Sequence, residues 1–367
     1  MSTCYLVICE DGLKDRTSGA FRRVEGDHRQ SVQGGREDAQ PVVWLIFVAG
    51  AAGIFVAGST LARNGAAIAE RTGIGQVWIG ALLVAGATSL PEITTDTAAV
   101  LRDHPQLATG DLFGSNMANM AILAILALAF RRARLIQREA LGIMLTASVA
   151  IVLTGLAVLF IVARLETSIA GSLSYGSVAL FVAAVLGIAL FPSYREAVGE
   201  AETPLEALPT LRRAVLSFAA GTALILVAAP VLVASAEEIA EITGLAETFI
   251  GVLGLAVATS IPELATTWVA VRMGALDLAV GNLYGSNAIN MSILIWLDAI
   301  YTKAPLLENA DVANAVAGIV AMLLMMVGLT VMVLRAERRR FPIDPAAAII
   351  LAGYVLGVLL VWGVSAQ

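Results

Sequence analysis

The chain has few of the residues that usually organise a soluble domain or a transition-metal site. Its two cysteines, Cys4 and Cys9, both lie near the N-terminus, so neither disulfides nor thiolate metal sites hold the core together. His28 and His104 are the only histidines, which excludes a histidine-based metal centre. Charged residues make up 14% of the chain, against about 25% in soluble domains. No basic run indicates a nucleic-acid partner.

Hydrophobic residues are abundant instead, at 58% of the chain, and the mean hydropathy is +0.84. A membrane-spanning helix needs about 20 mostly apolar residues. The sequence therefore predicts an all-α integral membrane protein with ten transmembrane helices, at roughly 42–64, 74–101, 106–130, 140–163, 169–191, 212–236, 246–271, 277–301, 312–334 and 345–364. Residues 1–41 are polar, and we expect them to form a disordered tail that is dispensable for function.

One segment of 42 residues occurs twice, and the second copy follows the first at a constant offset of 171 positions. Residues 79–120 and 250–291 are identical at 21 of the 42 aligned positions, with the agreement concentrated on Thr, Ser, Pro, Glu, Gly and Asn. Duplicated segments with helix breakers are the sequence pointer to a midplane ion site in a secondary transporter.

Positive residues predict the orientation of the chain in the membrane. Placing the arginine clusters at 131–138 and 335–340 in the cytoplasm gives thirteen basic residues in inner loops against three in outer loops, with both termini outside. Five spans per half then make the duplication an inverted repeat. The expected units are a first five-helix repeat at 42–191, a short cytoplasmic linker at 192–211 and a second, inverted five-helix repeat at 212–364.

A proline interrupts the second span and another the seventh. Pro91 and Pro262 lack an N–H, so the carbonyls of Ala87 and Ala258, four residues earlier, lose their helical partners. At membrane depth a free carbonyl is tolerated only where it faces protein, water or a ligand. These two backbone oxygens are therefore candidate ligands.

Each kink also carries a threonine and a glutamate four residues apart, Thr88 with Glu92 and Thr259 with Glu263. Carboxylates, hydroxyls and carbonyls are hard oxygen ligands that suit Ca²⁺ or Na⁺. A charged residue at mid-membrane costs about 2.5–3.5 kcal/mol on insertion scales and is seldom kept without a role. A silent protonated glutamate or an arginine partner are the alternatives, but the two 42-residue copies contain no Lys or Arg except Arg102 and Arg272, both at span ends.

A second repeated motif, G-S-N-x-x-N, adds Ser115 with Asn119 and Ser286 with Asn290, whose oxygens would complete the shell. Alternatively, small polar motifs only pack membrane helices. The glycines at 110, 114, 281 and 285 are expected to allow close backbone approach or a helix break. Three further acids are weaker candidates: Asp96, Asp298 and Asp111, the last of which would only cap a broken third span.

The paired T-S-[LI]-P-E and G-S-N-x-x-N motifs resemble the alpha repeats of the sodium/calcium exchanger family of cation/calcium antiporters, over residues 42–364. The resemblance implies that spans two, three, seven and eight form an ion-binding core, against which spans one and six slide. It also implies that Glu92 and Glu263 coordinate Ca²⁺ and Na⁺, with ligand positions at Thr88, Ser89, Thr259, Ser260, Ser115, Ser286, Asn119 and Asn290. Some sodium-coupled members have an acidic residue where this chain has Asn290.

The resulting prediction is a secondary antiporter that exchanges Ca²⁺ for Na⁺ across a prokaryotic cell membrane, needing no cofactor and using no catalytic residues. A Ca²⁺/H⁺ exchanger that uses the same two glutamates is the nearest alternative. An intramembrane hydrolase is disfavoured because no histidine, lysine or cysteine lies beside the repeat serines in the sequence as an activating base. A channel fits kinked inverted halves less well than alternating access does. Its partners would be inorganic cations and the lipid bilayer, and the sequence identifies no protein partner.

Overall fold

The computed structural model describes residues 41–74, 76–130, 141–164, 168–170, 173–190, 209–243, 256–307, 310–333 and 344–365. Almost all of the predicted tail at 1–41 lies outside the described residues, as do most of the linker at 192–211 and the start of the seventh span. The two arginine clusters on which the orientation rests lie outside them as well.

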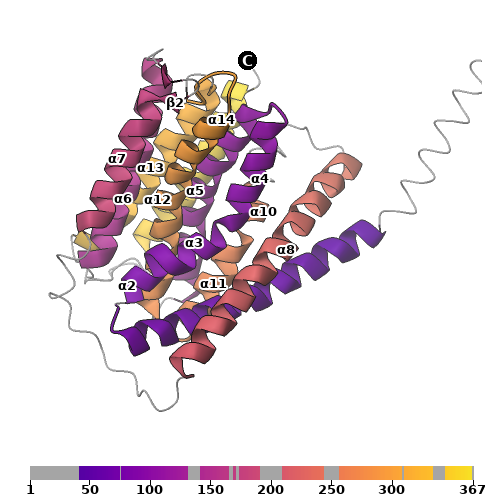
Figure 1. Cartoon of the computed structure of the whole chain (residues 1–367), viewed down its shortest axis with the longest axis vertical. Coiled ribbons are helices and arrows are strands. Elements are labelled where there is room, and N and C mark those ends of the chain that lie inside the picture. Colours follow the sequence, from indigo (N-terminus) through magenta and orange to yellow (C-terminus); the bar gives the residue numbers. More distant parts are fainter. Residues whose placement is uncertain are drawn as a thin grey trace, which may run out of the picture.

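Helices account for nearly all of the described chain (Figure 1). The first half comprises a helix at Pro41–Thr72, then α2 (Gln76–Trp78), the π-helix η1 (Ile79–Val84), α3 (Ala85–Thr88), α4 (Leu90–Leu101), α5 (Pro105–Ala129), α6 (Leu141–Ala163) and α7 (Tyr175–Leu190). The second half comprises α8 (Leu211–Thr243), α10 (Ala256–Thr259), α11 (Ile261–Arg272), α12 (Leu276–Ile300), α13 (Val312–Val333) and α14 (Pro345–Ser365). Each described segment falls at a predicted span.

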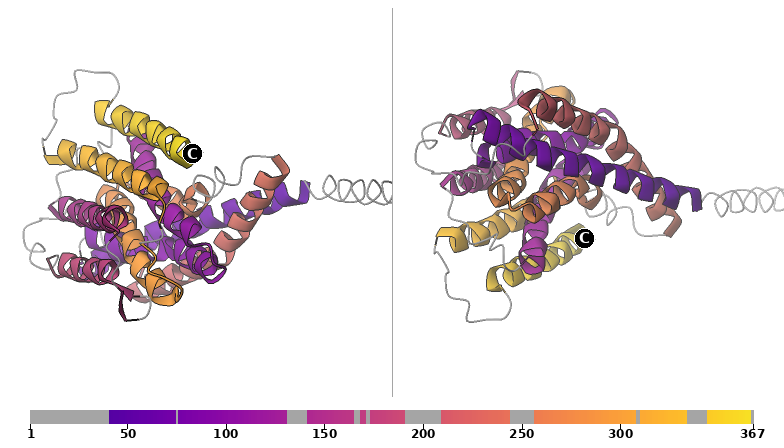
Figure 2. Two further views of the ribbon diagram at one scale, coloured as in Figure 1. Left: turned by 90° about the horizontal axis from the view of Figure 1, so that it is seen from above. Right: turned by 90° about the horizontal axis from the view of Figure 1, so that it is seen from below.

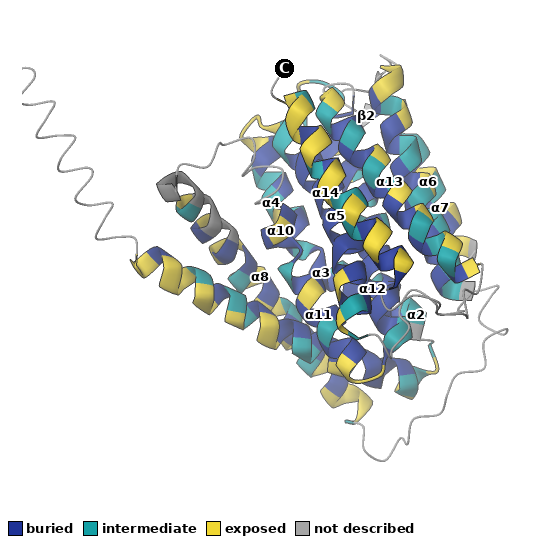
Figure 3. Cartoon of the chain, turned by 180° about the vertical axis from the view of Figure 1, so that it is seen from behind, coloured by how far each residue is buried: buried dark blue, intermediate teal, exposed yellow. Residues whose placement is uncertain are grey.

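Among the described residues, six helices are long and apolar enough to cross a membrane: Pro41–Thr72, α5, α6, α8, α13 and α14. Helix α5 lies at the centre, with 78% of its most apolar stretch buried, whereas the corresponding share is 22–44% in the other five. The outer helices carry many exposed residues (Figure 3). Large apolar side chains such as Leu159, Val227 and Leu359 are among the exposed residues. A soluble protein could not tolerate so much exposed apolar surface, and we conclude that lipid covers these faces.

The two predicted kinks are confirmed, and each consists of a single residue. Helix α3 ends at Thr88 and α4 begins at Leu90, so Ser89 (φ −85°, ψ 6°) forms the break. Ser260 (φ −81°, ψ 2°) takes the same place between α10 and α11. Proline occupies the first turn of both downstream helices, the position where its missing N–H removes no hydrogen bond from the downstream helix itself.

The third and eighth spans, by contrast, do not break. Helices α5 and α12 each run for 25 residues through the whole G-S-N motif. Asp111 lies in the interior of α5, well past its N-cap at His104, and the prediction that it caps a broken helix is therefore wrong. The motif glycines of the second half serve close approach instead: a methyl group on Gly281 would lie 2.9 Å from the Val77 carbonyl oxygen, and one on Gly285 would collide with the Ala81 carbonyl.

The helix at Pro41–Thr72 and α8 are the two longest, at 32 and 33 residues, and both continue beyond the predicted spans at 42–64 and 212–236. They lie side by side and cross the bundle obliquely (Figures 1 and 2). Glycines allow this contact: a methyl group placed on Gly53 would lie 3.5 Å from the Ala228 methyl, and one on Gly50 would lie 3.4 Å from the Leu232 Cβ. Small residues let two helices approach closely in a membrane.

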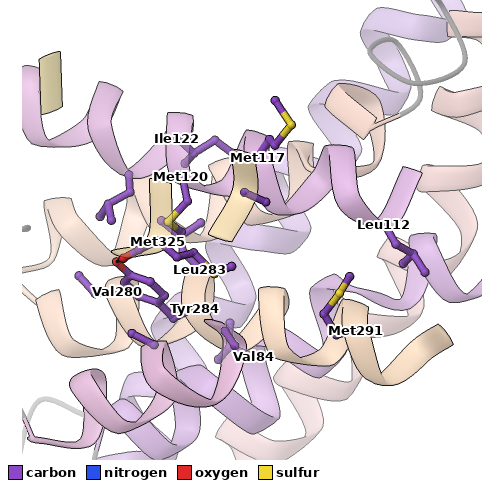
Figure 4. Close-up of a cluster of buried hydrophobic side chains, with 14 of the residues drawn as sticks. Val84, Leu112, Met117, Met120, Ile122, Val280, Leu283, Tyr284, Met291 and Met325 are labelled. Carbon is purple, nitrogen blue, oxygen red and sulfur yellow. Dashed lines mark hydrogen bonds between the residues drawn. The ribbon is translucent and has the colours of Figure 1, made fainter. Parts of the chain in front are cut away.

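Apolar side chains from η1, α5, α12 and α13 fill the middle of the bundle (Figure 4). Tyr284 is the largest fully buried side chain, and its hydroxyl donates a hydrogen bond to the Met325 carbonyl at 3.4 Å. The methionines Met120 and Met291 are also fully buried in this cluster. The Tyr284 hydrogen bond links α12 to α13 within this cluster.

A small two-stranded antiparallel ribbon, β1 (Ser168–Ala170) with β2 (Leu173–Ser174), precedes α7 and was not predicted. It is anchored by Asp298 of α12, whose Oδ2 accepts hydrogen bonds from the Ser174 N–H (2.9 Å), the Ser174 hydroxyl (3.0 Å) and the Ser177 hydroxyl (2.6 Å). Its Oδ1 accepts the Leu306 N–H at 2.6 Å. Both oxygens of Asp298 accept hydrogen bonds, so this acid ties the ribbon, the start of α7 and the segment before α13 to α12.

Candidate functional site

The helix break in each half contacts the unbroken G-S-N helix of the other half: the break between α3 and α4 contacts α12, and the break between α10 and α11 contacts α5. The Thr88 hydroxyl donates to Asn282 Oδ1 of α12 at 3.4 Å. In the other half, the Thr259 hydroxyl donates to Asp111 Oδ1 of α5 at 3.3 Å and lies 3.2 Å from the Ser115 hydroxyl. These five polar side chains have no exposed surface. One buried site is therefore built from both halves.

The two glutamates lie one residue after the prolines, in the first turn of α4 and of α11. Both are fully buried. The Ser286 hydroxyl donates to Glu263 Oε1 at 3.1 Å, while Glu263 Oε2 and both oxygens of Glu92 have no partner among the described residues. Three carboxylate oxygens are thus free for a ligand.

Four asparagines of the G-S-N motifs bond across the interface between α5 and α12. Asn119 Nδ2 donates to Asn287 Oδ1 at 2.9 Å, and Asn290 Nδ2 donates to Asn116 Oδ1 at 3.1 Å. The offset of 171 relates these two bonds to each other. Asn116 Nδ2 also donates to the Asn287 carbonyl at 3.3 Å. The nitrogens of Asn119 and Asn290 are occupied, and their side-chain oxygens remain unpartnered.

Unpartnered buried atoms of this region are almost all oxygens. Within the described part of the chain, eleven of the twelve buried side-chain atoms without a hydrogen bond are oxygens, on Ser89, Glu92, Asp96, Asp111, Asn119, Ser260, Glu263, Thr266 and Asn290. No Lys, Arg or His is buried among the described residues. Buried polar atoms normally have partners, and free oxygens without any internal cation indicate a site for a positively charged ligand.

The carboxylates alone do not form a metal cage. No group of three or more His, Cys, Asp or Glu side chains converges anywhere in the described ranges. A cation held here would need a mixed shell in which hydroxyl, amide and backbone oxygens supplement the glutamates. Such shells are typical of Ca²⁺, which accepts carbonyl and amide oxygens together with carboxylates.

The structure brings the residues of both predicted motifs into one buried region. All predicted side chains are at most 2% exposed, and Ala87 and Ala258 lie beside them, at 6% and 5%. Asn116 and Asn287 were missed as site residues, although their place in both copies of the motif was a signal for them. Asn282 and Thr267 were missed because only the fold shows that they bond to each other, at 3.1 Å.

The family model described as "Sodium/calcium exchanger protein" matches residues 42–194 and 213–363 of this chain. The chain belongs to the sodium/calcium exchanger protein family. This family is one of membrane antiporters and not of enzymes. The two matched stretches fall on the two halves, on either side of the short connecting segment.

Two bacterial relatives agree with this membership of the sodium/calcium exchanger family. The inner membrane protein YrbG of Escherichia coli K12 is 32% identical over 262 residues, covering 65% of this chain and 74% of the relative. The putative antiporter CaxA of Alkalimonas amylolytica is 30% identical over 261 residues, covering 71% and 79%. The chain is accordingly a membrane protein of an antiporter family with bacterial members.

The fold of the sodium/calcium exchanger family is found in solved structures as well. The sodium-calcium exchanger NCX_Mj, soaked with 100 mM Na⁺ and 10 mM Sr²⁺, superposes with a TM-score of 0.65 at 20% identity, over 86% of this chain and 97% of that one. The same exchanger soaked with 10 mM Na⁺ and no Ca²⁺ gives a TM-score of 0.65 at 19% identity, over 86% and 98%. The likeness extends over nearly the whole of the solved chain.

Proposed function

We propose that this protein is a secondary antiporter that exchanges Ca²⁺ for Na⁺ at one site built from both halves. The observation that carries the proposal is the set of buried, unpartnered oxygens at the two breaks, contributed crosswise by α4 and α11 together with α5 and α12. Membership of the sodium/calcium exchanger family supports it.

In this proposal Glu92 and Glu263 supply the negative charge that balances the cation. The remaining ligands are neutral oxygens, on Thr88, Ser89, Thr259, Ser260, Ser115, Ser286, Asn119 and Asn290, with the carbonyls of Ala87 and Ala258. Two carboxylates balance one Ca²⁺ or two Na⁺, so either load leaves the site formally neutral. A site of this kind exchanges the two ions, because neither binds with a large excess of buried charge.

The architecture we propose has ten transmembrane helices in two inverted repeats, at 42–191 and 212–364, joined by a cytoplasmic linker at 192–211. The excess of arginine in the predicted inner loops supports an orientation with both termini outside a prokaryotic cell membrane. The helix at Pro41–Thr72 and α8 would move together against the core to open the site alternately. Their close contact at Gly50 and Gly53, which meet Leu232 and Ala228 of α8, would let the two helices move as one unit.

Both G-S-N motifs end in asparagine, at Asn119 and Asn290. These neutral residues are compatible with either Na⁺ or H⁺ as the counter-ion. Their nitrogens are bound to Asn287 and Asn116, so each presents a neutral oxygen where an acidic residue would present a charge. A Ca²⁺/H⁺ exchanger, in which the two glutamates take up protons as Ca²⁺ leaves, is the second candidate.

The test is ⁴⁵Ca²⁺ uptake into proteoliposomes under an imposed Na⁺ gradient or an imposed pH gradient. Uptake driven by outward-directed Na⁺ at equal pH supports Na⁺ exchange, and uptake driven only by the pH gradient supports the second candidate. Glu92→Gln and Glu263→Gln should each abolish uptake, because each removes one of the two charges that balance Ca²⁺. Near-parental uptake by either purified variant would refute the assignment of the site.

A matched control is Glu238→Gln, which removes an exposed carboxylate of α8 distant from the breaks in sequence. It should transport as the parent does, so that a loss in the two site variants reflects the position of the charge and not the total charge. Size-exclusion profiles of all variants check that each protein inserts and folds.

A further inference from the structure

Because the chain is internally repeated, each residue of the site can be compared with its equivalent in the other half. One pair of equivalent positions is acidic in the first half and neutral in the second. In the second half Asn282 Nδ2 donates to the Thr267 hydroxyl at 3.1 Å, a neutral donor–acceptor pair between α12 and α11. The offset of 171 assigns Asp111 and Asp96 to the same two places in the first half. There two buried carboxyl groups, on α5 and α4, take the places of the amide and the hydroxyl.

A pair of carboxylates cannot satisfy itself as the amide and hydroxyl do, because neither ionised group has a proton to donate. Both side chains are fully buried. Asp111 Oδ1 accepts the Thr259 hydroxyl at 3.3 Å, but Asp111 Oδ2 and both oxygens of Asp96 have no partner among the described residues. No buried basic side chain in the described residues compensates them. Burying such charges without a counter-charge is costly.

We propose that Asp96, Asp111 and Thr259 form a binding position for Na⁺, next to the site of Glu92 and Glu263 and present only in the first half. The proposal rests on the antiport function proposed above. The donors are all oxygens, which excludes soft metals. They are also few, namely three free carboxylate oxygens and one hydroxyl, whereas Ca²⁺ takes six to eight oxygens.

Two consequences distinguish this position from the remainder of the site. It has no counterpart in the second half, where Asn282 and Thr267 satisfy each other, so the cation load is not distributed symmetrically between the halves. It also shares Thr259 with the site of Glu263. An ion at Asp96 and Asp111 therefore fixes the orientation of a hydroxyl on which the neighbouring site depends, and the occupancies of the two positions are coupled.

The experiment replaces the acidic pair by the pair that this chain uses at the equivalent place. The double variant Asp96→Thr/Asp111→Asn copies Thr267 and Asn282, whose side chains bond to each other in the same surroundings. Equilibrium binding of ²²Na⁺ and ⁴⁵Ca²⁺ is measured on purified full-length protein in detergent. We expect the variant to bind one Na⁺ fewer per chain, with a larger loss for Na⁺ than for Ca²⁺.

Asp311→Asn is the matched control, because it removes an exposed carboxylate at the start of α13 and should leave the ²²Na⁺ count unchanged. If the double variant does not fold, the near-isosteric single variant Asp96→Asn is measured instead, and it too should bind one Na⁺ fewer per chain. An unchanged ²²Na⁺ count, as expected if the two aspartates only share a proton, overturns the proposal while leaving Ca²⁺ exchange intact. Equal losses of ⁴⁵Ca²⁺ and ²²Na⁺ also overturn it, since the pair would then belong to the Ca²⁺ site. A parent that binds neither ion refutes the antiport function itself.

Discussion

Substituting Gly285 by alanine tests whether close backbone approach positions the second G-S-N motif. The added methyl group would lie 2.5 Å from the Ala81 Cα and 2.8 Å from its carbonyl carbon. Non-bonded carbon atoms prefer about 3.5–4.0 Å, so α12 and η1 would have to separate by about 1 Å. Overpacking of this kind costs about 1–3 kcal/mol, which exceeds the gain of up to about 1 kcal/mol from replacing a helical glycine.

The displacement should also reach the site, because Ser286 follows Gly285 and donates to Glu263. We therefore expect Gly285→Ala to lower both the thermal stability in detergent and the rate of Ca²⁺ exchange. Gly86→Ala is the matched control: its methyl would meet only the Ile289 Cδ1, at 3.9 Å, which is an ordinary contact. That variant should be as stable as the parent or more so. A Gly285→Ala protein with parental stability and transport would refute the close-packing argument.

Three further variants test other parts of the molecule. Asn290→Asp adds a carboxylate near the site and should change the Na⁺ or pH dependence of initial Ca²⁺ exchange rates, whereas superimposable curves at two pH values would remove Asn290 from the site. Deleting residues 1–38 should leave transport unchanged, and loss of activity in a folded truncated protein would contradict this. In the loop after α4, hydrogen bonds from Lys303 (2.7 Å) and Tyr301 (3.1 Å) hold the pKa of Asp103 below its ordinary 3.8. The stability from this contact is present above that ordinary value and lost as pH falls through the lowered pKa, so Asp103→Asn should flatten the acid side of a plot of melting temperature against pH.

Features that depend on one residue and its near neighbours were predictable from the sequence. A proline removes a helical hydrogen bond wherever it stands, and for this reason the breaks at Ser89 and Ser260 followed from Pro91 and Pro262. The apolar runs likewise predicted the helices. The extra length of Pro41–Thr72 and α8 was not predicted, because polar residues such as Asn64 lower the local hydropathy without ending a helix.

Features that depend on partners distant in the sequence were not predictable in the same way. Asp298 and Asp96 are both buried acids, yet one has four hydrogen bonds and the other none. The difference lies in which donors the fold brings to each side chain. Asp111 was misread because the glycines around it predicted a break, while packing against other helices keeps α5 continuous. The bonds of Asn116 and Asn287 required the two halves to be placed against each other.

The anchoring of the ribbon and α7 by Asp298 has a consequence for the order in which the chain assembles. The Ser174 and Ser177 donors belong to the end of the first half, but their acceptor is made only when synthesis has reached the second half, and the Leu306 N–H later still. The first half of the chain therefore leaves the ribosome with α7 incompletely anchored. Expressed alone, that half should remain loose at α7, and supplying the second half as a separate chain should complete it.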